Sequence, residues 1–202
     1  MNDKNLKITV VGIGGGAQKA VDYLFLNNKL SNIKFALINS DKKFLECAKT
    51  ENKLLIHGEN KKFYGLGCGG DLKTGEEYAE FCIDKIEQLF TDTDIAVLIS
   101  CFGGGCGTGA TPVIAKLLKS KGIKTIAIIT KPFYFEGELR ATKTNLGINK
   151  LNKYVDKIID LENQDLIETL EQKTSLKEIF DYSNKKITEI FKKEIDKIIN
   201  GK

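Results

Sequence analysis

The chain has 202 residues, of which 42% are hydrophobic, and a formal net charge of +4, so it is long enough to bury one core. Its lysines are spread along the chain, which gives nucleic-acid binding no specific support. No apolar run approaches the ~20 residues of a membrane span. Five cysteines without a Cys-x-x-Cys motif and a single histidine argue against a disulfide scaffold or a metal centre and favour reduced thiols in the cytoplasm.

Strands and helices are predicted to alternate along the first half of the chain. Residues 8–11 are β-rich and lead into the glycine loop Gly12-Ile13-Gly14-Gly15-Gly16-Ala17, after which the apolar spacing predicts a helix. A second strand is predicted over residues 32–38, closed by Asn39-Ser40-Asp41, and a third over residues 53–56. A second glycine loop, residues 65–70, precedes a helix predicted over residues 76–90.

The second half continues the alternation. A fourth strand over residues 94–100 leads into a loop over residues 101–109, in which five of the seven residues from Gly103 to Gly109 are glycine. A fifth strand over 123–130, a helix over 138–154 and a sixth strand over 155–161 follow. The pattern predicts an α/β fold, a Rossmann-like parallel sheet with helices on both faces, whose ligands bind at the carboxyl ends of the strands.

The last segment is predicted to be a long amphipathic helix. Ser175-Leu176-Lys177-Glu178 has the form of a capping box. One face carries Ile179, Phe180, Ile187, Ile190, Phe191, Ile195 and Ile198, and the other carries Asp181, Lys185, Thr188, Glu189, Lys192, Lys193 and Asp196. We expect one domain over residues 1–174 and a C-terminal helix over residues 175–202 that packs on it.

The glycine loops predict a site for a phosphorylated ligand. A strand, a glycine turn and a helix start present free backbone N–H groups and the positive end of the helix dipole to an anion. The first loop also satisfies G-x-G-x-x-A and is followed by Asp41, which leaves an NAD-dependent Rossmann enzyme open as an alternative. No G-x-x-x-x-G-K-[ST] motif is present, so an ordinary P-loop is excluded.

Four motifs resemble those of the tubulin/FtsZ family. Gly103-Gly104-Gly105-Cys106-Gly107-Thr108-Gly109 resembles the signature GGGTG[ST]G, and residues 65–70 resemble the loop GLGAGA. Asn39-Ser40-Asp41 resembles NTD, and residues 130–137 followed by Arg140 resemble TKPFxFEGxxR. Because the matches occur in family order over about the whole chain, the chain resembles the nucleotide-binding domain of FtsZ.

The resemblance implies that the glycine loops bind the phosphates of GTP or GDP. Backbone N–H groups and one hydroxyl would hold them, and the residues implied are Gly14, Gly15, Gly16, Gly103, Gly104, Gly105, Cys106, Gly107, Thr108 and Gly109. Cys68, Gly69 and Gly70 would face the γ-phosphate. Asp41 would lie near Mg²⁺ or its water ligands, since a carboxylate suits a hard cation.

The resemblance also implies contacts to the ribose and the base. Glu136 would bind the ribose, and Arg140, the only arginine, a phosphate oxygen. Asn163 falls on the family's guanine-reading asparagine, Phe180 would cover the base, and Asn184 would reach its edge. Core packing of Phe180 and a surface ion pair between Glu136 and Arg140 stay open as alternatives.

Two residues of the predicted site depart from the family pattern. Lys19 stands where FtsZ has asparagine, and a lysine there reaches either a phosphate, the ribose or solvent. Cys106 replaces the signature threonine, so a weak thiol donor takes the place of a hydroxyl. We expect a lower nucleotide affinity, with the backbone contacts retained.

In the family, the long helix leads to an acidic loop and a second domain, and that loop completes the site of the next subunit. The sequence stops at Lys202, where the loop would begin, so we expect no catalytic residue here and weak GTP hydrolysis by the chain alone.

The implied partner is an FtsZ filament or FtsZ-like subunit in bacterial cell division, without self-assembly of this chain alone. The polar outer face of the last helix favours a natural single-domain protein over a fragment. A non-enzymatic filament-capping or assembly-regulating module is the alternative function.

Overall fold

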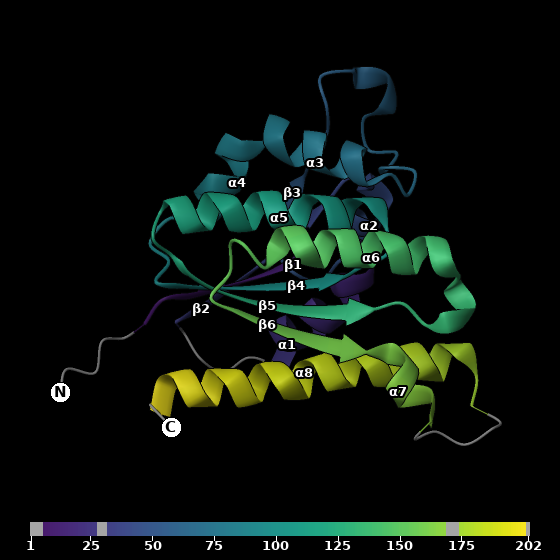
Figure 1. Ribbon diagram of the computed structural model, residues 1–202. Coiled ribbons are helices and arrows are strands. Elements are labelled where there is room, and N and C mark those ends of the chain that lie inside the picture. The colour runs from purple at the N-terminus through teal and green to yellow at the C-terminus, as the bar shows by residue number, and fades with distance from the viewer. Residues whose placement is uncertain (1–5, 28–31, 169–173, 201–202) are drawn as a thin grey trace.

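Figure 1 shows the computed structural model, which describes residues 6–27, 32–168 and 174–200. Six parallel strands form one sheet in the order β3-β2-β1-β4-β5-β6. The strands are β1 Ile8–Ile13, β2 Ile33–Asn39, β3 Asn52–Leu55, β4 Ile95–Cys101, β5 Lys124–Lys131 and β6 Lys157–Glu162. The predicted α/β fold is therefore confirmed, and the two outer ends of the predicted domains, residues 1–5 and 201–202, lie outside the described residues.

Helices cover both faces of the sheet (Figure 1). One face carries α3 Leu72–Phe81, α4 Ile83–Leu89, α5 Gly105–Ser120 and α6 Glu138–Leu151, and the other carries α1 Gln18–Asn27 and α8 Leu176–Asn200. Alternate residues of a strand point to opposite faces. Val11 and Ile13 of β1 therefore belong to the core under α5, whereas Ile8 and Val10 belong to the core shared with α1 and α8.

Two short helices that the sequence did not predict follow strands directly. Helix α2, Lys42–Cys47, follows β2, and helix α7, Asn163–Glu168, follows β6. Asp41 begins α2 by accepting hydrogen bonds from the N–H groups of Lys43 and Phe44 at 2.9 and 3.4 Å. No helix in the described ranges is long and apolar enough to cross a bilayer.

The helix predicted over residues 76–90 is two helices, because the chain bends at Cys82. Cys82 is buried, with φ −98° and ψ 16°, and its thiol lies 3.5 Å from both the N and the O of His57. The bend thus places Cys82 against the backbone that follows β3. Helix α3 also starts four residues earlier than predicted, because Asp71 caps it through the N–H of Thr74 at 2.8 Å.

Helix α5 begins inside the glycine run that the sequence predicted as a loop. Glycine is a poor helix former, but here its missing Cβ lets α3 approach. A Cβ on Gly109 would overlap the carbonyl oxygen of Leu72 and lie 3.0 Å from the N of Glu76, and one on Gly105 would lie 2.7 Å from the O of Asp71. The backbones of α3 and α5 are therefore in direct contact.

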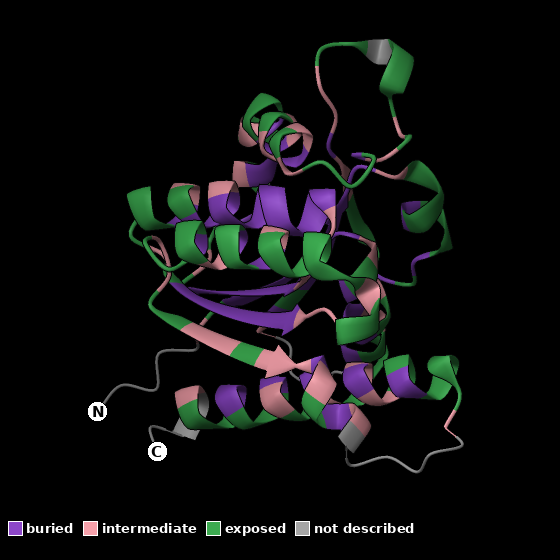
Figure 2. Cartoon of the chain, turned by 45° about the vertical axis from the view of Figure 1, so that its right-hand side comes forward, coloured by how far each residue is buried: buried purple, intermediate pink, exposed green. Residues whose placement is uncertain are grey.

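Helix α8 packs on the sheet through one face, as Figure 2 shows by its alternation of buried and exposed residues. Its predicted capping box is present, with Ser175 N–H donating to Glu178 at 2.8 Å and Glu178 N–H donating to Ser175 Oγ at 3.3 Å. Thr188, predicted on the solvated face, is buried, and its hydroxyl donates to the carbonyl of Asn184 at 3.0 Å. A threonine tolerates burial when its hydroxyl donates to a carbonyl of the preceding turn. The polar and apolar pattern, which counts threonine as polar, therefore wrongly predicted Thr188 on the solvated face.

A buried carboxylate fixes α8 against the edge strand β6. Glu194 is 9% exposed and accepts hydrogen bonds from Lys157 of β6 at 2.5 Å and from Lys197 at 2.7 Å. The hydrogen bond from Lys157, followed by that from Lys197, holds the pKa of Glu194 below its usual range. A carboxylate with a lowered pKa stabilises the fold above its unfolded pKa, and this stability is lost as the pH falls through the folded pKa.

Replacing Gly109 by alanine tests the contact between α3 and α5. Gly109→Ala should lower the free energy of unfolding by about 3 kcal/mol, because the new methyl group meets the backbone of α3 rather than a movable side chain. Gly104→Ala is the matched control, since a Cβ there meets no atom within 4 Å. Urea denaturation followed by circular dichroism measures both, and equal stabilities of the two variants would contradict the packing argument.

Replacing Glu194 by glutamine tests the attachment of α8. Glu194→Gln should cost about 1 kcal/mol of unfolding free energy at neutral pH. The difference from the parent chain should shrink as the pH falls below the ordinary range of a glutamate and through the lowered pKa of Glu194, where the parent carboxylate takes up a proton. Asp196→Asn, on the exposed face of α8 and without an ion pair among the described residues, is the control and should change stability little. A stability difference that stays constant with pH would refute this role.

Candidate functional site

A cavity of about 800 Å³ opens at the carboxyl ends of the strands. It lies where the strand order reverses between β1 and β4, the place at which parallel α/β sheets bind ligands. The structure brings most of the predicted site residues to its wall. These are Gly14, Gly15, Gly16, Lys19, Asp41, Cys68, Gly70, Gly104, Gly105, Cys106, Gly107, Glu136, Arg140, Asn163, Phe180 and Asn184.

The other four predicted residues, Gly69, Gly103, Thr108 and Gly109, do not line the cavity. The Thr108 side chain is buried, and its hydroxyl accepts the N–H of Gly103 at 2.8 Å. Gly103 has φ +106°, a conformation that favours glycine, so this hydrogen bond shapes the turn between β4 and α5. Gly109 faces α3. Gly103, Thr108 and Gly109 therefore shape the backbone around the cavity, whereas Gly69 is exposed.

The first turn of α5 forms one wall of the cavity. The N–H groups of Gly105, Cys106 and Gly107 have no preceding helical carbonyl to bond, and the positive end of the helix dipole lies there. The loop after β1 comes close to this turn, because a Cβ on Gly14 would lie 2.9 Å from the N of Gly107. Two glycine loops from different strands thus meet at one anion-binding wall.

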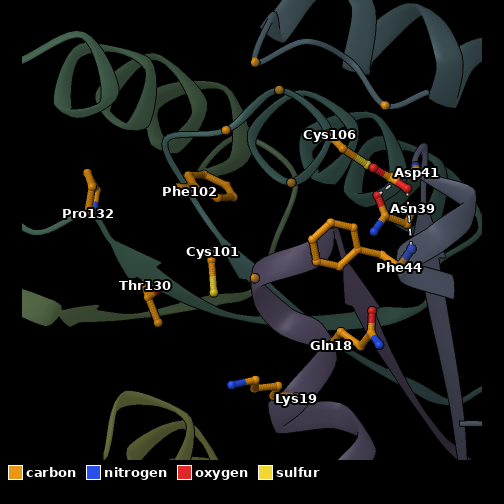
Figure 3. A pocket seen from close by; sticks show the side chains of 18 of the residues that line it. Gln18, Lys19, Asn39, Asp41, Phe44, Cys101, Phe102, Cys106, Thr130 and Pro132 are labelled. Atoms are coloured by element: carbon orange, nitrogen blue, oxygen red, sulfur yellow. Dashed lines mark hydrogen bonds between the residues drawn. The ribbon is translucent and has the colours of Figure 1, made fainter. Parts of the chain in front are cut away.

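Asn39 and Asp41 stand at the end of β2 on the same side of the cavity (Figure 3). Asn39 Oδ1 accepts the N–H of Asp41 at 3.2 Å, and Asp41 Oδ1 caps α2. The Oδ2 atom lies near Gly67, where an added Cβ would be 3.9 Å away. Among the described residues, no three His, Cys, Asp or Glu side chains gather into a metal site.

Two thiols lie on the cavity wall beside Ser40. Cys68 Sγ donates to Ser40 Oγ at 3.1 Å. The neighbouring Cys106 thiol, more than the Ser40 hydroxyl, lowers the pKa of Cys68 against the opposing effect of burial. The interaction with Cys68, together with burial, raises the pKa of Cys106.

Glu136 and Arg140 form the ion pair that the sequence left open, and both also line the cavity. Glu136 holds the turn before α6 as well, because its Oε1 accepts the N–H of Phe133 at 2.9 Å. The Arg140 side chain is 53% exposed, so its guanidinium keeps donors available to a ligand at the mouth of the cavity.

Residues of α7 and α8 close the other end of the cavity. Asn163 is buried, and its Oδ1 accepts the hydroxyl of Ser183 at 2.7 Å, which leaves its amide N–H donors for other partners. Phe180 is 41% exposed and packs edge to face on Phe133 at 5.4 Å, so it is not a core residue. With Asn184 nearby on the same helix, this end offers an aromatic face beside amide groups.

Sequence reasoning missed several lining residues, and Gln18 is the most informative. Its Oε1 atom is buried and has no hydrogen-bond partner among the described residues. A buried acceptor without a donor is costly, so this atom fits a ligand that brings an N–H or O–H group. Its position directly after the first glycine loop is the signal that could have found it. The neighbouring Lys19 pairs with Asp181 of α8 at 3.4 Å (its side chain is labelled in Figure 3).

Lys131 also lines the cavity, and it belonged to a quoted motif without a predicted role. It donates to Asp160 at 2.8 Å and to Glu162 at 3.1 Å, both on the neighbouring strand β6. The hydrogen bond with Asp160 raises the pKa of Lys131 and lowers that of Asp160. The Lys131 ammonium is therefore held by two carboxylates at the edge of the sheet.

A parallel sheet whose strand order reverses at a cavity with a helix N-terminus in its wall is the arrangement in which α/β proteins bind phosphorylated ligands. Residues 7–171 match the model of the Tubulin/FtsZ family, GTPase domain, and the chain belongs to this family. This is a family of GTPases.

Relatives and solved structures agree with the family. The cell division protein FtsZ of Buchnera aphidicola subsp. Baizongia pistaciae (strain Bp) is 38% identical over 182 residues, which cover 90% of this chain and 46% of that protein. The cell division protein FtsZ of Coxiella burnetii is 36% identical over 181 residues, with the same coverage of each chain. The structure of an empty FtsZ dimer from M. jannaschii has a TM-score of 0.87 and 32% identity, and the match covers 95% of this chain and 55% of that one. The chain thus spans about half the length of the relatives it matches.

Proposed function

We propose that this chain binds GTP and GDP as the nucleotide-binding unit of an FtsZ-type cell division protein. The observation that carries the proposal is the cavity with an anion-binding wall at one end and an aromatic and amide wall at the other. Phosphates are expected at the first turn of α5, and the base is expected between Phe180 and Asn163. Helix α8 completes the site, so residues up to 174 and the helix that follows act as one unit.

The phosphate end accounts for most of the predicted residues. Backbone N–H groups of Gly14, Gly15 and the first turn of α5 bind phosphate oxygens without a charged side chain. Arg140 supplies a bidentate donor from the mouth of the cavity. Mg²⁺, when bound, neutralises phosphate charge. Because no three protein ligands gather among the described residues, the Asp41 carboxylate would contribute to the Mg²⁺ site and phosphate oxygens and water would supply the other ligands.

The base end favours guanine. The Asn163 amide keeps N–H donors that suit an acceptor on the base, because Ser183 occupies its carbonyl oxygen. Gln18 Oε1 supplies an unused acceptor for a sugar hydroxyl or a base N–H. No observation favours the NAD-dependent enzyme left open by the sequence, because the loop after β4 supplies the phosphate wall and that enzyme's fingerprint does not contain it.

We further propose that this chain hydrolyses GTP slowly by itself. Among the described residues that line the cavity, the carboxylates are Asp41 and Glu136. Asp41 caps α2, and Glu136 is bonded to Arg140 and to the N–H of Phe133. Neither is placed as a general base for an attacking water. A carboxylate from a second polypeptide, such as an FtsZ subunit, would complete the site.

The base end is tested with Phe180→Ala. We expect this variant to bind GDP about tenfold more weakly, since stacking of an aromatic side chain on a base is worth about 1–3 kcal/mol. Leu176→Ala is the matched control, because Leu176 is exposed on the same helix and does not line the cavity. Titration calorimetry with GDP and ADP measures both variants. Equal affinities of the parent chain for GDP and ADP, or no effect of Phe180→Ala, would refute the assignment.

Hydrolysis is tested by phosphate release with and without an intact FtsZ. The chain alone should turn over slowly, and added FtsZ should raise release by at least about tenfold above the sum of the separate rates. The Phe180→Ala chain should show less stimulation, because less of it carries nucleotide. A rate of phosphate release that equals the sum of the two separate rates, at every ratio of this chain to FtsZ, would contradict the proposal. If this chain then also changed filament length, the non-enzymatic capping or regulating module would be the better function.

A further inference from the structure

Two cysteines from distant parts of the sequence meet on the phosphate side of the cavity. Cys68 lies in the loop before α3, and Cys106 is the second residue of α5. Both line the cavity, their side chains interact, and Ser40 accepts a hydrogen bond from Cys68 Sγ at 3.1 Å. Figure 3 shows the Cys106 side chain pointing from α5 toward Asn39 and Asp41. Both cysteines are free thiols.

Close backbone packing holds the loop that carries Cys68 against the helix that carries Cys106. A Cβ on Gly105 would lie 2.8 Å from Cys68 Cβ and 2.7 Å from the O of Asp71, so the loop rests directly on the first turn of α5. On its other side, Lys143 of α6 donates to the carbonyl of Gly70 at 2.6 Å. A disulfide requires neighbouring Cβ atoms and little backbone movement, and this packing lays the Cys68 side chain on the turn of α5 that carries Cys106.

The two thiols differ in their chemistry. The neighbouring Cys106 thiol lowers the pKa of Cys68, whereas burial and the interaction with Cys68 raise that of Cys106. The Asp71 carboxylate faces Cys68 and opposes part of this lowering. Cys68 is therefore the better thiolate and the attacking residue, and Cys106 is the thiol that resolves the intermediate.

We propose that Cys68 and Cys106 form a reversible disulfide in response to a peroxide, and that this bond weakens the binding of GTP. The Cys68 thiolate attacks one oxygen of hydrogen peroxide and breaks the O–O bond, so Cys68 becomes a sulfenic acid and hydroxide leaves. The hydroxide takes up the proton that the Cys68 thiol lost and becomes water. The Cys106 sulfur then attacks the Cys68 sulfur, and a second water leaves. The two thiols are oxidised by two electrons, and the peroxide is reduced to two waters.

The link to GTP rests on the proposed function, whereas the disulfide itself does not. Gly67, Gly69 and Gly70 have φ values of +83°, +56° and +76°, so glycines flank Cys68 on both sides. The disulfide fastens this glycine loop to the first turn of α5. A fastened loop cannot adjust around a third phosphate, so GTP should lose more affinity than GDP.

The disulfide is tested on the full chain by peptide mapping. The reduced protein is treated with hydrogen peroxide, digested without reductant and analysed by mass spectrometry. We expect one main cross-linked species that joins the peptides of Cys68 and Cys106, lacks two hydrogens and disappears with dithiothreitol. Cys68→Ala and Cys106→Ala should abolish it. Cys47→Ser, which changes an exposed thiol of the same cavity, should retain it.

The nucleotide link is tested by calorimetry with GTP and with GDP on the reduced and oxidised chain. Oxidation should weaken GTP binding by about tenfold and GDP binding less, and Cys106→Ala should bind both nucleotides with affinities that do not depend on oxidation.

A main cross-link through Cys47 or Cys101, or stable sulfenic acid without a cross-link, would refute the disulfide between Cys68 and Cys106. A disulfide that leaves both affinities unchanged would overturn its link to GTP. A reduced chain that binds no nucleotide would refute the proposed function, while the peptide map still decides the disulfide.

Discussion

The direct contact between the backbones of α3 and α5 is the constraint on which the site depends. It exists because glycine stands where the helices meet: a Cβ at Gly105 or Gly109 would overlap the backbone of α3 or of the turn before it. The same contact fixes the first turn of α5 at the carboxyl edge of the sheet. It also lays the loop that carries Cys68 on that turn. One packing requirement thus positions the anion-binding wall and both thiols of the proposed redox pair.

Several polar side chains at or near the cavity also hold the turns and helix ends that surround it. Asp41 begins a helix, Thr108 holds a turn, and Glu136 closes another turn while pairing with Arg140. Only the end lined by Phe180 and Asn184 depends on α8, which the buried Glu194 attaches to the sheet edge. Polar groups with such structural bonds are oriented before a ligand arrives, which lowers the entropic cost of binding. Gln18 differs, because its buried acceptor has no partner among the described residues.

The sequence predicted the class of fold and most of the cavity wall, because apolar periodicity and glycine loops are local signals. It was wrong where tertiary contacts overrode local propensity. The run from Gly105 to Gly109 was expected as loop and is helix, since close packing on α3 outweighs the weak helix propensity of glycine. The helix expected over residues 76–90 bends at Cys82, whose thiol lies against the His57 backbone. Apolar spacing on its own carried no sign of that bend.

By itself, the sequence determined the alternation of strands and helices, the family resemblance and most of the residues that line the cavity. These follow from motifs in which neighbouring residues act together. The tertiary structure decided which glycines line the cavity and which serve helix packing, because that depends on what lies opposite each missing Cβ. It also decided that Cys68 and Cys106 are neighbours. No local pattern encodes a contact between two distant loops, since only the packing of α3 on α5 brings them together.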